Sequence, residues 1–540
     1  MNETSSENQV SHLPKGWVLT TLSEVINFTN GFAFKSSDYK TAGVKIVRIG
    51  DIQNNSLNTS EMNCVGENLF ENLDKKFRVE PNDLVIAMSG ATTGKLGFNK
   101  TTEKLLLNQR VGKFEFFLVS SKYAFYYLST KIQENLSISL GSAIPNLSTE
   151  QINNISFPLP PLAEQERIVL KIEELFTKLD AGVSELKQAQ AQLKRYRQSI
   201  LKSAVTGELT RDWRKANQTE PAEILLKLIL KERREKWEAD QLKKFAEAGK
   251  TPKNADWKKK YKEPASPSTE NLPELPKGWT WASIDELASF EPNSITDGPF
   301  GSNLKTSHYT DSGERVIRLK NIGDGYFIDA KAYISLEHSN FLRKHQIKAN
   351  DLAIATLGER LPRACIIPEF VGQAIVKADC IKFSSNLNAV LPKYVNFALN
   401  AENTRNRVTE SVHGVGRPRL NLGEVREIAL PLPPLAEQEK IVEEVERLLS
   451  VADAVEKTLA ESLKQAERLR QSILQKAFTG KLVPQDKRDE PASILLERIK
   501  KEREAKKDAE SKRRGETAKK PKIKVQKPKT KKAAQGNLPF

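Results

Sequence analysis

The sequence predicts an α+β protein with two α/β-type globular domains and internal pseudo-two-fold symmetry. Two long α-helices separate the domains and pair as an antiparallel coiled coil. Three observations support this fold class. The sequence repeats itself once in matched order, each copy contains short apolar runs punctuated by Gly, Asn and Asp, and each copy contains a long heptad pattern. The 540 residues also exceed one ordinary domain, at about 100–200 residues per domain.

Four blocks define the repeat, and they occur in the same order in both halves. LPKGW (13–17) recurs at 275–279, PLPPLAEQE (158–166) at 431–439, RQSILKSAVTGEL (197–209) as RQSILQKAFTGKL (470–482), and EPAEILL (220–226) as EPASILL (490–496). A period near 270 residues is too long for a solenoid. The blocks therefore indicate a tandem duplication of a complete module.

The repeat also predicts the domain boundaries. We expect a disordered N-terminus (1–12), a first globular domain (13–160), a first spacer helix (161–209), a charged helix and linker (210–271), a second globular domain (272–433), a second spacer helix (434–482), and a charged helix with a basic disordered tail (483–540). The globular parts agree only sparsely with each other, whereas the helical parts are closely alike.

Each spacer helix follows a Pro pair and begins with acidic residues, which the helix dipole favours in the first turn. Gly207 and Gly480 mark the ends. Apolar residues then alternate in steps of four and three, which predicts a coiled-coil seam. The predicted seam residues are Ile168, Ile172, Leu175, Leu179, Leu186, Leu193, Ile441, Val445, Leu448, Val455, Leu459 and Ile473. The two helices of one chain are the favoured pair because they are always close together. Pairing with a second chain is the alternative.

Composition excludes several classes of protein. The net charge of +16 is concentrated in residues 497–540, which hold 17 Lys and Arg against 6 Asp and Glu, so the rest of the chain carries only +5. The basic tail predicts a polyanionic partner, and the body can bind one only through local patches. No apolar run is long enough for a membrane helix, and no secretory signal is found. Three cysteines predict a reduced, cytoplasmic protein without a disulfide framework.

The layout of a variable domain, a PLPPLAEQE helix ending in TGEL, a second variable domain and a PLPPLAEQE helix ending in TGKL resembles the specificity subunit of type I restriction-modification systems. The resemblance implies two target-recognition domains, each of which binds one half of a bipartite, asymmetric double-stranded DNA site. It also implies two methyltransferase subunits and two restriction subunits as partners. Cofactors are expected on those partners and not on this chain: S-adenosylmethionine for adenine-N6 methylation, and ATP with Mg for restriction.

Loops rich in small, polar and basic residues are the candidate DNA contacts. They are Lys35, Ser89, Thr92, Thr93, Lys95, Asn108, Gln109, Arg110, Lys305, Arg360, Arg363, Arg417 and Arg419. SGATTGKL (89–96) does not match a phosphate-binding loop, because only three residues lie between its glycines where that motif has four, and Leu96 follows the lysine. A tight turn for this loop, a strand end for LNQR (107–110) and a solvated loop for HGVGRPRL (413–420) remain the alternatives.

The sequence contains no motif for methyl transfer, for nucleotide hydrolysis or for a metal site. We therefore expect a catalytically inert chain that gives separate enzymes their specificity. A stand-alone nuclease or methyltransferase would need such a motif. A non-catalytic coiled-coil DNA-binding scaffold is the remaining alternative, but it would not need two large domains that differ while the helices stay alike.

Overall fold

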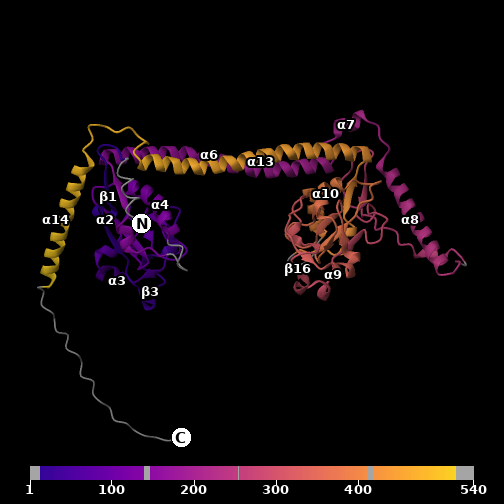
Figure 1. Ribbon diagram of the computed structural model, residues 1–540, viewed down its shortest axis with the longest axis horizontal. Helices are drawn as coiled ribbons and strands as arrows, with labels where there is room; N and C mark the ends of the chain where they lie inside the picture. The colour runs from indigo at the N-terminus through magenta and orange to yellow at the C-terminus, as the bar shows by residue number, and fades with distance from the viewer. Residues whose placement is uncertain (1–12, 139–145, 253, 412–417, 519–540) are drawn as a thin grey trace, which may run out of the picture. The chain divides into compact units, whose positions relative to one another are not determined.

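A computed structural model describes residues 13–138, 146–252, 254–411 and 418–518 (Figure 1). The chain divides into two compact units, residues 1–184 with 463–540 and residues 185–462. Each unit contains one α+β domain and about half of each long helix. The expected fold class is therefore confirmed, and each unit is assembled from both halves of the sequence.

Three small sheets form the domain of the first unit. β1 (Val18–Thr21) pairs antiparallel with β13 (Ser156–Leu159). A six-stranded sheet has the order β2 (Ile26–Asn30), β12 (Val111–Phe116), β9 (Leu84–Ala87), β10 (Leu96–Phe98), β6 (Ser56–Leu57) and β5 (Ile52–Gln53). A five-stranded sheet has the order β3 (Tyr39–Lys40), β7 (Cys64–Val65), β4 (Val44–Val47), β11 (Leu105–Leu107) and β8 (Arg78–Val79).

Helices close this domain around an aromatic core. They are α2 (Leu22–Val25), α3 (Glu67–Asn72), α4 (Ser121–Ile138), α5 (Thr149–Asn153) and the C-terminal α14 (Ala492–Ala518), with short 3-10 helices η1 (Ser36–Asp38), η2 (Ile49–Asp51) and η3 (Lys75–Phe77). Tyr123, Phe114 and Phe157 are among the largest buried side chains. The core also takes Ala492, Leu495 and Ile499 from α14, so the end of the sequence completes the first domain.

The second unit repeats this plan. β14 (Thr280–Ser283) pairs with β24 (Ala429–Leu432), and a four-stranded sheet has the order β15 (Ile295–Asp297), β23 (Cys380–Phe383), β20 (Leu352–Ala355) and β21 (Arg363–Ile366). A five-stranded sheet has the order β16 (Tyr309–Thr310), β18 (Tyr333–Ile334), β17 (Glu314–Ile317), β22 (Ala374–Val376) and β19 (Gln346–Ile347).

The helices of the second unit include the counterpart of α14. They are α7 (Arg211–Ala216), α8 (Ala222–Glu247), α9 (Leu336–Phe341), α10 (Pro392–Asn400), α11 (Glu402–Ser411) and α12 (Leu422–Arg426), with 3-10 helices η4 (Asp256–Lys260), η5 (Gly301–Leu304), η6 (Thr306–His308), η7 (Leu319–Asn321), η8 (Arg343–His345) and η9 (Glu369–Val371). Ala222, Leu226 and Ile229 of α8 join the core of the second domain, as the matching residues of α14 join the first.

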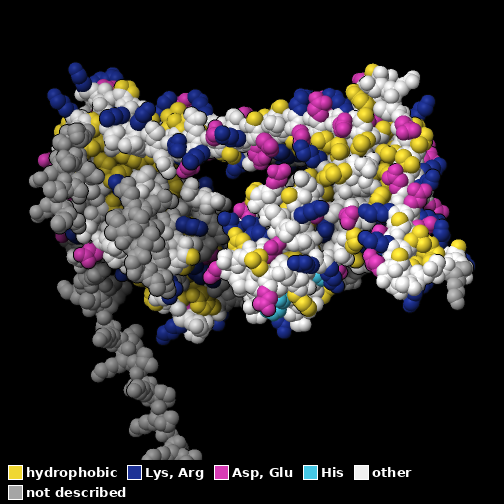
Figure 2. Space-filling model, turned by 45° about the vertical axis from the view of Figure 1, so that its right-hand side comes forward, with side chains coloured by type: hydrophobic (Ala, Val, Ile, Leu, Met, Phe, Trp, Pro, Cys, Tyr) yellow, Lys and Arg dark blue, Asp and Glu magenta, His cyan; other side chains and the backbone are white. Residues whose placement is uncertain are grey.

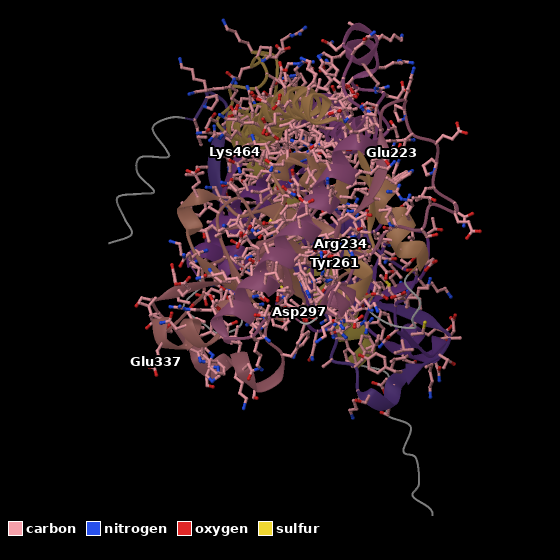
Figure 3. The ribbon with its side chains drawn as sticks, turned by 90° about the vertical axis from the view of Figure 1, so that its right-hand side faces the viewer. Glu223, Arg234, Tyr261, Asp297, Glu337 and Lys464 are labelled. Atoms are coloured by element: carbon pink, nitrogen blue, oxygen red, sulfur yellow. The ribbon has the colours of Figure 1, made fainter. Side chains whose placement is uncertain are left out.

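The segment that follows α8 folds back onto it. The rings of Trp237 and Trp257 lie 6.0 Å apart, and Tyr261 lies 5.3 Å from Trp237. Arg234 covers the Tyr261 ring at 5.6 Å, and both residues are labelled in Figure 3. The sequence predicts a linker here, and the aromatic residues of this linker explain why part of it has fixed contacts.

The long helices α6 (Leu162–Val205) and α13 (Leu435–Phe478) have 44 residues each, a length of ~66 Å. In the first unit Arg470 forms an ion pair with Asp180. In the second unit Arg197 binds Asp453 at 2.6 Å. From the first ion pair to the second, the residue number increases by 17 on α6, from 180 to 197, and decreases by 17 on α13, from 470 to 453. This register confirms that the two helices pair antiparallel within one chain.

The predicted seam residues have different surroundings along the helices. Ile168, Ile172 and Ile473 are buried in the core of the first domain, and Ile441 and Val445 in the core of the second. The remaining seam residues are half-buried, namely Leu175, Leu179, Leu186, Leu193, Leu448 and Leu459. Val455 is 44% exposed and lies outside the buried stripe. No helix among the described residues is long and apolar enough to cross a membrane.

Candidate nucleic-acid interface

The repeated motifs fasten each domain to the long helices. Trp17 of LPKGW donates its Nε1 hydrogen to Glu164 Oε2 at 2.9 Å, and Trp279 of the second LPKGW donates to Glu437 Oε2 at the same distance. Both carboxylates are buried, at 1% and 0% exposure. The glutamate of PLPPLAEQE is therefore a buried acceptor for a tryptophan, in addition to its favourable place in the first turn of the helix.

The glutamine that follows has an equally specific role. Gln165 accepts from Ser120 N at 2.9 Å and donates to Pro160 O at 3.0 Å. Gln438 likewise accepts from the backbone N–H of Leu391 at 2.9 Å and donates to Pro433 O. Each glutamine thus satisfies buried backbone groups that would otherwise have no partner. The motif therefore forms a joint between domain and helix, which the sequence alone did not reveal.

The glycine at the end of each long helix contacts the LPKGW segment of the other copy. Gly480 has φ 67°, and a Cβ atom there would lie 2.1 Å from Pro14 Cγ. Gly207 has φ 73°, and its Cβ would lie 2.6 Å from Pro276 Cγ. Each domain is therefore joined to the beginning of one long helix and the end of the other. The matched order of the blocks was the available signal for this exchange.

Burial changes the pKa of Glu164 in the first joint. Desolvation by burial raises the pKa of its carboxyl, while the hydrogen bonds from Gln485 and Trp17 oppose the change. Gln485 Nε2 lies 3.2 Å from Glu164 Oε1. Arg167 also lowers this pKa by its charge, but its guanidinium is committed to Asp489 at 2.6 Å. Burial therefore outweighs the local hydrogen bonds.

The candidate residues after β9 form a compact hairpin turn. Gly90 and Gly94 both have φ 84°, and Gly94 N donates to Ala87 O at 2.8 Å. Thr93 is 8% exposed and donates its hydroxyl to Gly90 O, which ties it to the turn. Thr92 is half-buried and donates to Ile49 O at 3.3 Å.

The remaining two candidates of this turn differ in their exposure. Lys95 is exposed and Ser89 is half-buried. The tight-turn alternative thus describes the backbone, and Lys95 remains available to a ligand.

A second candidate group lies against this turn. Asn108, Gln109 and Arg110 connect β11 to β12, and Gln109 and Arg110 are exposed. Met88 N donates to Arg110 O at 2.9 Å, which joins the two loops. Phe32, which lies three residues before Lys35, forms a backbone bridge with Asn108. The structure therefore brings together residues that the sequence separates by about 75 positions.

The basic candidates of the second domain differ in their availability. Lys305 is exposed and precedes η6, as Lys35 precedes η1, so these two lysines occupy equivalent positions. Arg363 lies in β21 and donates to Leu319 O at 3.4 Å. Arg419 is exposed and forms an ion pair with Asp379 at 2.7 Å. Arg417 lies outside the described residues.

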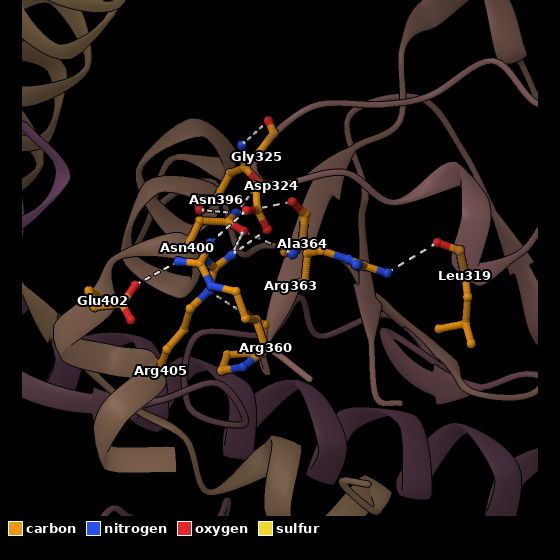
Figure 4. A network of polar contacts seen from close by, with 11 residues as sticks. Leu319, Asp324, Gly325, Arg360, Arg363, Ala364, Asn396, Asn400, Glu402 and Arg405 are labelled. Carbon is orange, nitrogen blue, oxygen red and sulfur yellow. Dashed lines mark hydrogen bonds and ion pairs between the residues drawn. The ribbon is translucent and has the colours of Figure 1, made fainter. Parts of the chain in front are cut away.

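Arg360 belongs to a polar network at the junction of α10 and α11 (Figure 4). Its guanidinium bridges Asp324 at 3.2 Å and Glu402 at 2.7 Å. Asp324 Oδ1 also forms an ion pair with Nη2 of the buried Arg405 at 3.0 Å. Arg405 in turn donates a hydrogen bond to Asn400 Oδ1 at 2.7 Å. Arg360 is half exposed and is held in place by this network, and the carboxylates around it offset its charge.

The charged surface agrees with the small excess charge of the body. Lys and Arg side chains are interspersed with Asp and Glu over the face seen in Figure 2, without one broad basic area. Among the residues with described coordinates, no three His, Cys, Asp or Glu side chains are grouped so that they could hold a metal ion. On this face the positive charge is therefore distributed over local sites.

Two α+β domains with different loops, each joined to a repeated pair of long helices, define the architecture of this protein. The type I restriction modification DNA specificity domain matches residues 14–193 and 301–465, and the chain belongs to this family. It is 28% identical to the type I restriction enzyme EcoBI specificity subunit of Escherichia coli over 93% of this chain and 97% of that one. It is 26% identical to the EcoKI specificity subunit of Escherichia coli strain K12 over 91% and 97% of the two chains.

A solved structure supports the fold independently. A chain described in work on complex assembly and conformational transition of the type I restriction-modification system superimposes with a TM-score of 0.59. The sequence identity is 15%, and the match covers 87% of this chain and 99% of that one. The fold of this chain is therefore shared with that chain.

Proposed function

We propose that this chain is the non-catalytic DNA-specificity subunit of a type I restriction-modification complex. It binds a bipartite, asymmetric double-stranded DNA site, with one half-site for each recognition domain. It directs partner subunits to methylate adenine N6 or to restrict the DNA. The proposal rests on the family assignment and on a match that covers 97% of the EcoBI specificity subunit.

The structural observation that carries the proposal is a repeated frame with different loops. Trp17 and Trp279 bind Glu164 and Glu437 in the same way. In contrast, the SGATTGKL turn of the first domain corresponds to TLGERLPR in the second, with different side chains. A protein that reads two unrelated sequences needs a constant support and two variable surfaces.

We propose two methyltransferase and two restriction subunits as partners, as the family resemblance implies. S-adenosylmethionine would then be held by the methyltransferase subunits, and ATP with Mg by the restriction subunits. This chain would contribute the DNA contacts and the docking frame.

Methylation mapping tests the proposal. The chain is expressed with its methyltransferase subunits in a host without N6-methyladenine, and the modified sites are sequenced. We expect one bipartite motif with a fixed gap. Replacing residues 18–145 by the domain of a relative should change one half of the motif only. A continuous motif, or a change in both halves, would show that the domains do not act as separate readers.

A further inference from the structure

The end of β20 in the second domain is built like the end of β9 in the first. Met88 N donates to Arg110 O at 2.9 Å, and Thr356 N donates to Asp379 O at 3.0 Å. Because each donor directly follows its strand, the two bonds mark the same point of the fold. Asp379 therefore stands where the first domain has Arg110, although the sequences around these two residues do not resemble each other.

A second pair of positions corresponds in the same way. Ser89 forms a backbone bridge with Asn146, and Leu357 forms one with Arg419. Arg419 therefore takes the place of Asn146. The two domains offer different chemistry on equivalent backbone: Arg and Asn in the first, Asp and Arg in the second.

Asp379 and Arg419 form a partly exposed pair. Arg419 Nη2 lies 2.7 Å from Asp379 Oδ1, and the side chains are 55% and 26% exposed for Arg419 and Asp379 respectively. Both residues line a cavity of about 400 Å³ together with Asp297, which is labelled in Figure 3, and Phe300. Phe300 is 53% exposed. Asp379 Oδ1 is buried, whereas the arginine is more than half exposed, so solvent screens this ion pair and its contribution to stability is modest.

The chemistry of the pair selects a ligand. A carboxylate is repelled by phosphate, so Asp379 is unsuited to the DNA backbone. It accepts hydrogen bonds, and the amino group of cytosine offers one in the major groove. Arginine donates to guanine O6 and N7. An acceptor beside a donor fork thus matches the edge of a single C·G base pair.

We infer that Asp379 and Arg419 together read one C·G base pair in the half-site of the second domain. Asp379 accepts from cytosine N4 and Arg419 donates to guanine. The inference rests on the proposed function, and it adds Asp379 to the candidate contacts. Asp379 also adopts φ 68°, a left-handed conformation that is uncommon for residues other than glycine and tends to persist at functional positions.

The test uses the full chain in complex with its methyltransferase subunits. Duplexes carry each of the four base pairs at each position of the second half-site, and methylation rates are compared. The native complex should select C·G at one position. Asp379→Asn and Arg419→Gln should each reduce selection at that same position by about ten- to a hundred-fold, and leave the first half-site unchanged.

Asp329→Asn is the matched control. It removes an ion pair in which Asp329 Oδ1 lies 2.6 Å from Arg315 Nη2, and neither residue lines the cavity. It should leave all preferences intact. The inference is overturned if the native second half-site selects no C·G pair, if both variants retain full selection, or if they affect different positions. If Asp379→Asn does not fold, the exposed Arg419→Gln decides the matter. A native complex without any bipartite preference would instead refute the proposed function.

Discussion

The two domain joints differ in how their buried glutamate is satisfied. Glu164 accepts from Trp17 and Gln485, which are both neutral donors. Glu437 accepts from Trp279, from Thr210 Oγ1 at 2.7 Å and from Arg214 Nε at 2.9 Å. The two joints thus share the tryptophan–glutamate bond and differ in its support, with a cation bound directly to the glutamate in the second joint only. The second joint should be the more costly to break.

The largest effect should follow from separating the two halves of the sequence. In the intact chain, the first domain takes Ile473, Ala477 and Leu495 from the second half. A half chain of residues 1–271 lacks them but carries the equivalent Ile200, Ala204 and Leu225. In a pair of such fragments, each copy can therefore supply these core residues to the domain of the other. We expect a stable homodimer with a two-fold axis. Light scattering coupled to size-exclusion chromatography measures its mass.

The matched control for this experiment is the same fragment with Gly207→Leu. Its side chain would clash where the glycine approaches the proline of LPKGW. It should reduce dimerisation at equal concentration. A folded, monomeric 1–271 fragment would show that the exchange between halves is dispensable.

The next largest effect distinguishes the two joints. Glu437→Ala leaves Arg214, Thr210 and Trp279 without their acceptor, and we expect a loss of about 3–4 kcal/mol in the second unit. Glu164→Ala leaves two neutral donors, and we expect about 2 kcal/mol in the first unit. Hydrogen-exchange mass spectrometry on β14–β24 and β1–β13 measures each unit separately.

Glu443→Ala is the control for the pair, because Glu443 is an exposed partner of Lys440 with a side chain 67% exposed. It should change protection in neither unit by more than about 0.5 kcal/mol. Equal losses at the two joints, or a larger loss at Glu164, would show that the cation adds nothing to the second joint.

The sequence predicted the frame well because its signals are local or repeated. Periodicity located the long helices, and the repeat of LPKGW and PLPPLAEQE showed that two equivalent modules exist. The bond between Trp17 and Glu164 spans 147 residues, and no local pattern specifies it. Likewise, Val455 fits the heptad pattern but is exposed, because the pattern gives spacing and not the position of the facing helix.

The candidate interface was less predictable for a physical reason. Loops were selected by their small and basic residues, which included Arg360 and did not include Asp379. Arg360 is held by Asp324 and Glu402, whose approach depends on the tertiary fold. Asp379 carries the opposite charge to the one sought, and only its backbone bond to Thr356 shows its equivalence to Arg110. Composition indicates affinity for DNA, whereas selection among bases depends on such placed groups.

The smallest effect concerns the pH dependence of the first joint. Burial raises the pKa of Glu164 in the folded state above its ordinary value, so the folded protein binds more protons than the unfolded chain between the two pKa values. Stability contributed by this carboxyl is therefore fully present below the unfolded pKa and is lost as the pH rises through the folded pKa. Glu164→Gln does not titrate and keeps an acceptor oxygen for Trp17, so its cost should be under about 1 kcal/mol at low pH.

The stability of the variant relative to the native protein should consequently increase as the pH rises. Above the folded pKa of Glu164, the variant should be at least as stable as the native protein. Exchange protection of β1 and β13, measured against pH, gives the difference. Glu166→Gln, on the exposed side of the same helical turn, is the control and should show no such trend. If the native protein instead became more stable than the variant with rising pH, the ionised carboxylate would be the stabilising form. The hydrogen bonds from Trp17 and Gln485 would then outweigh the desolvation of Glu164, and the pKa of its carboxyl would be lowered by folding instead of raised.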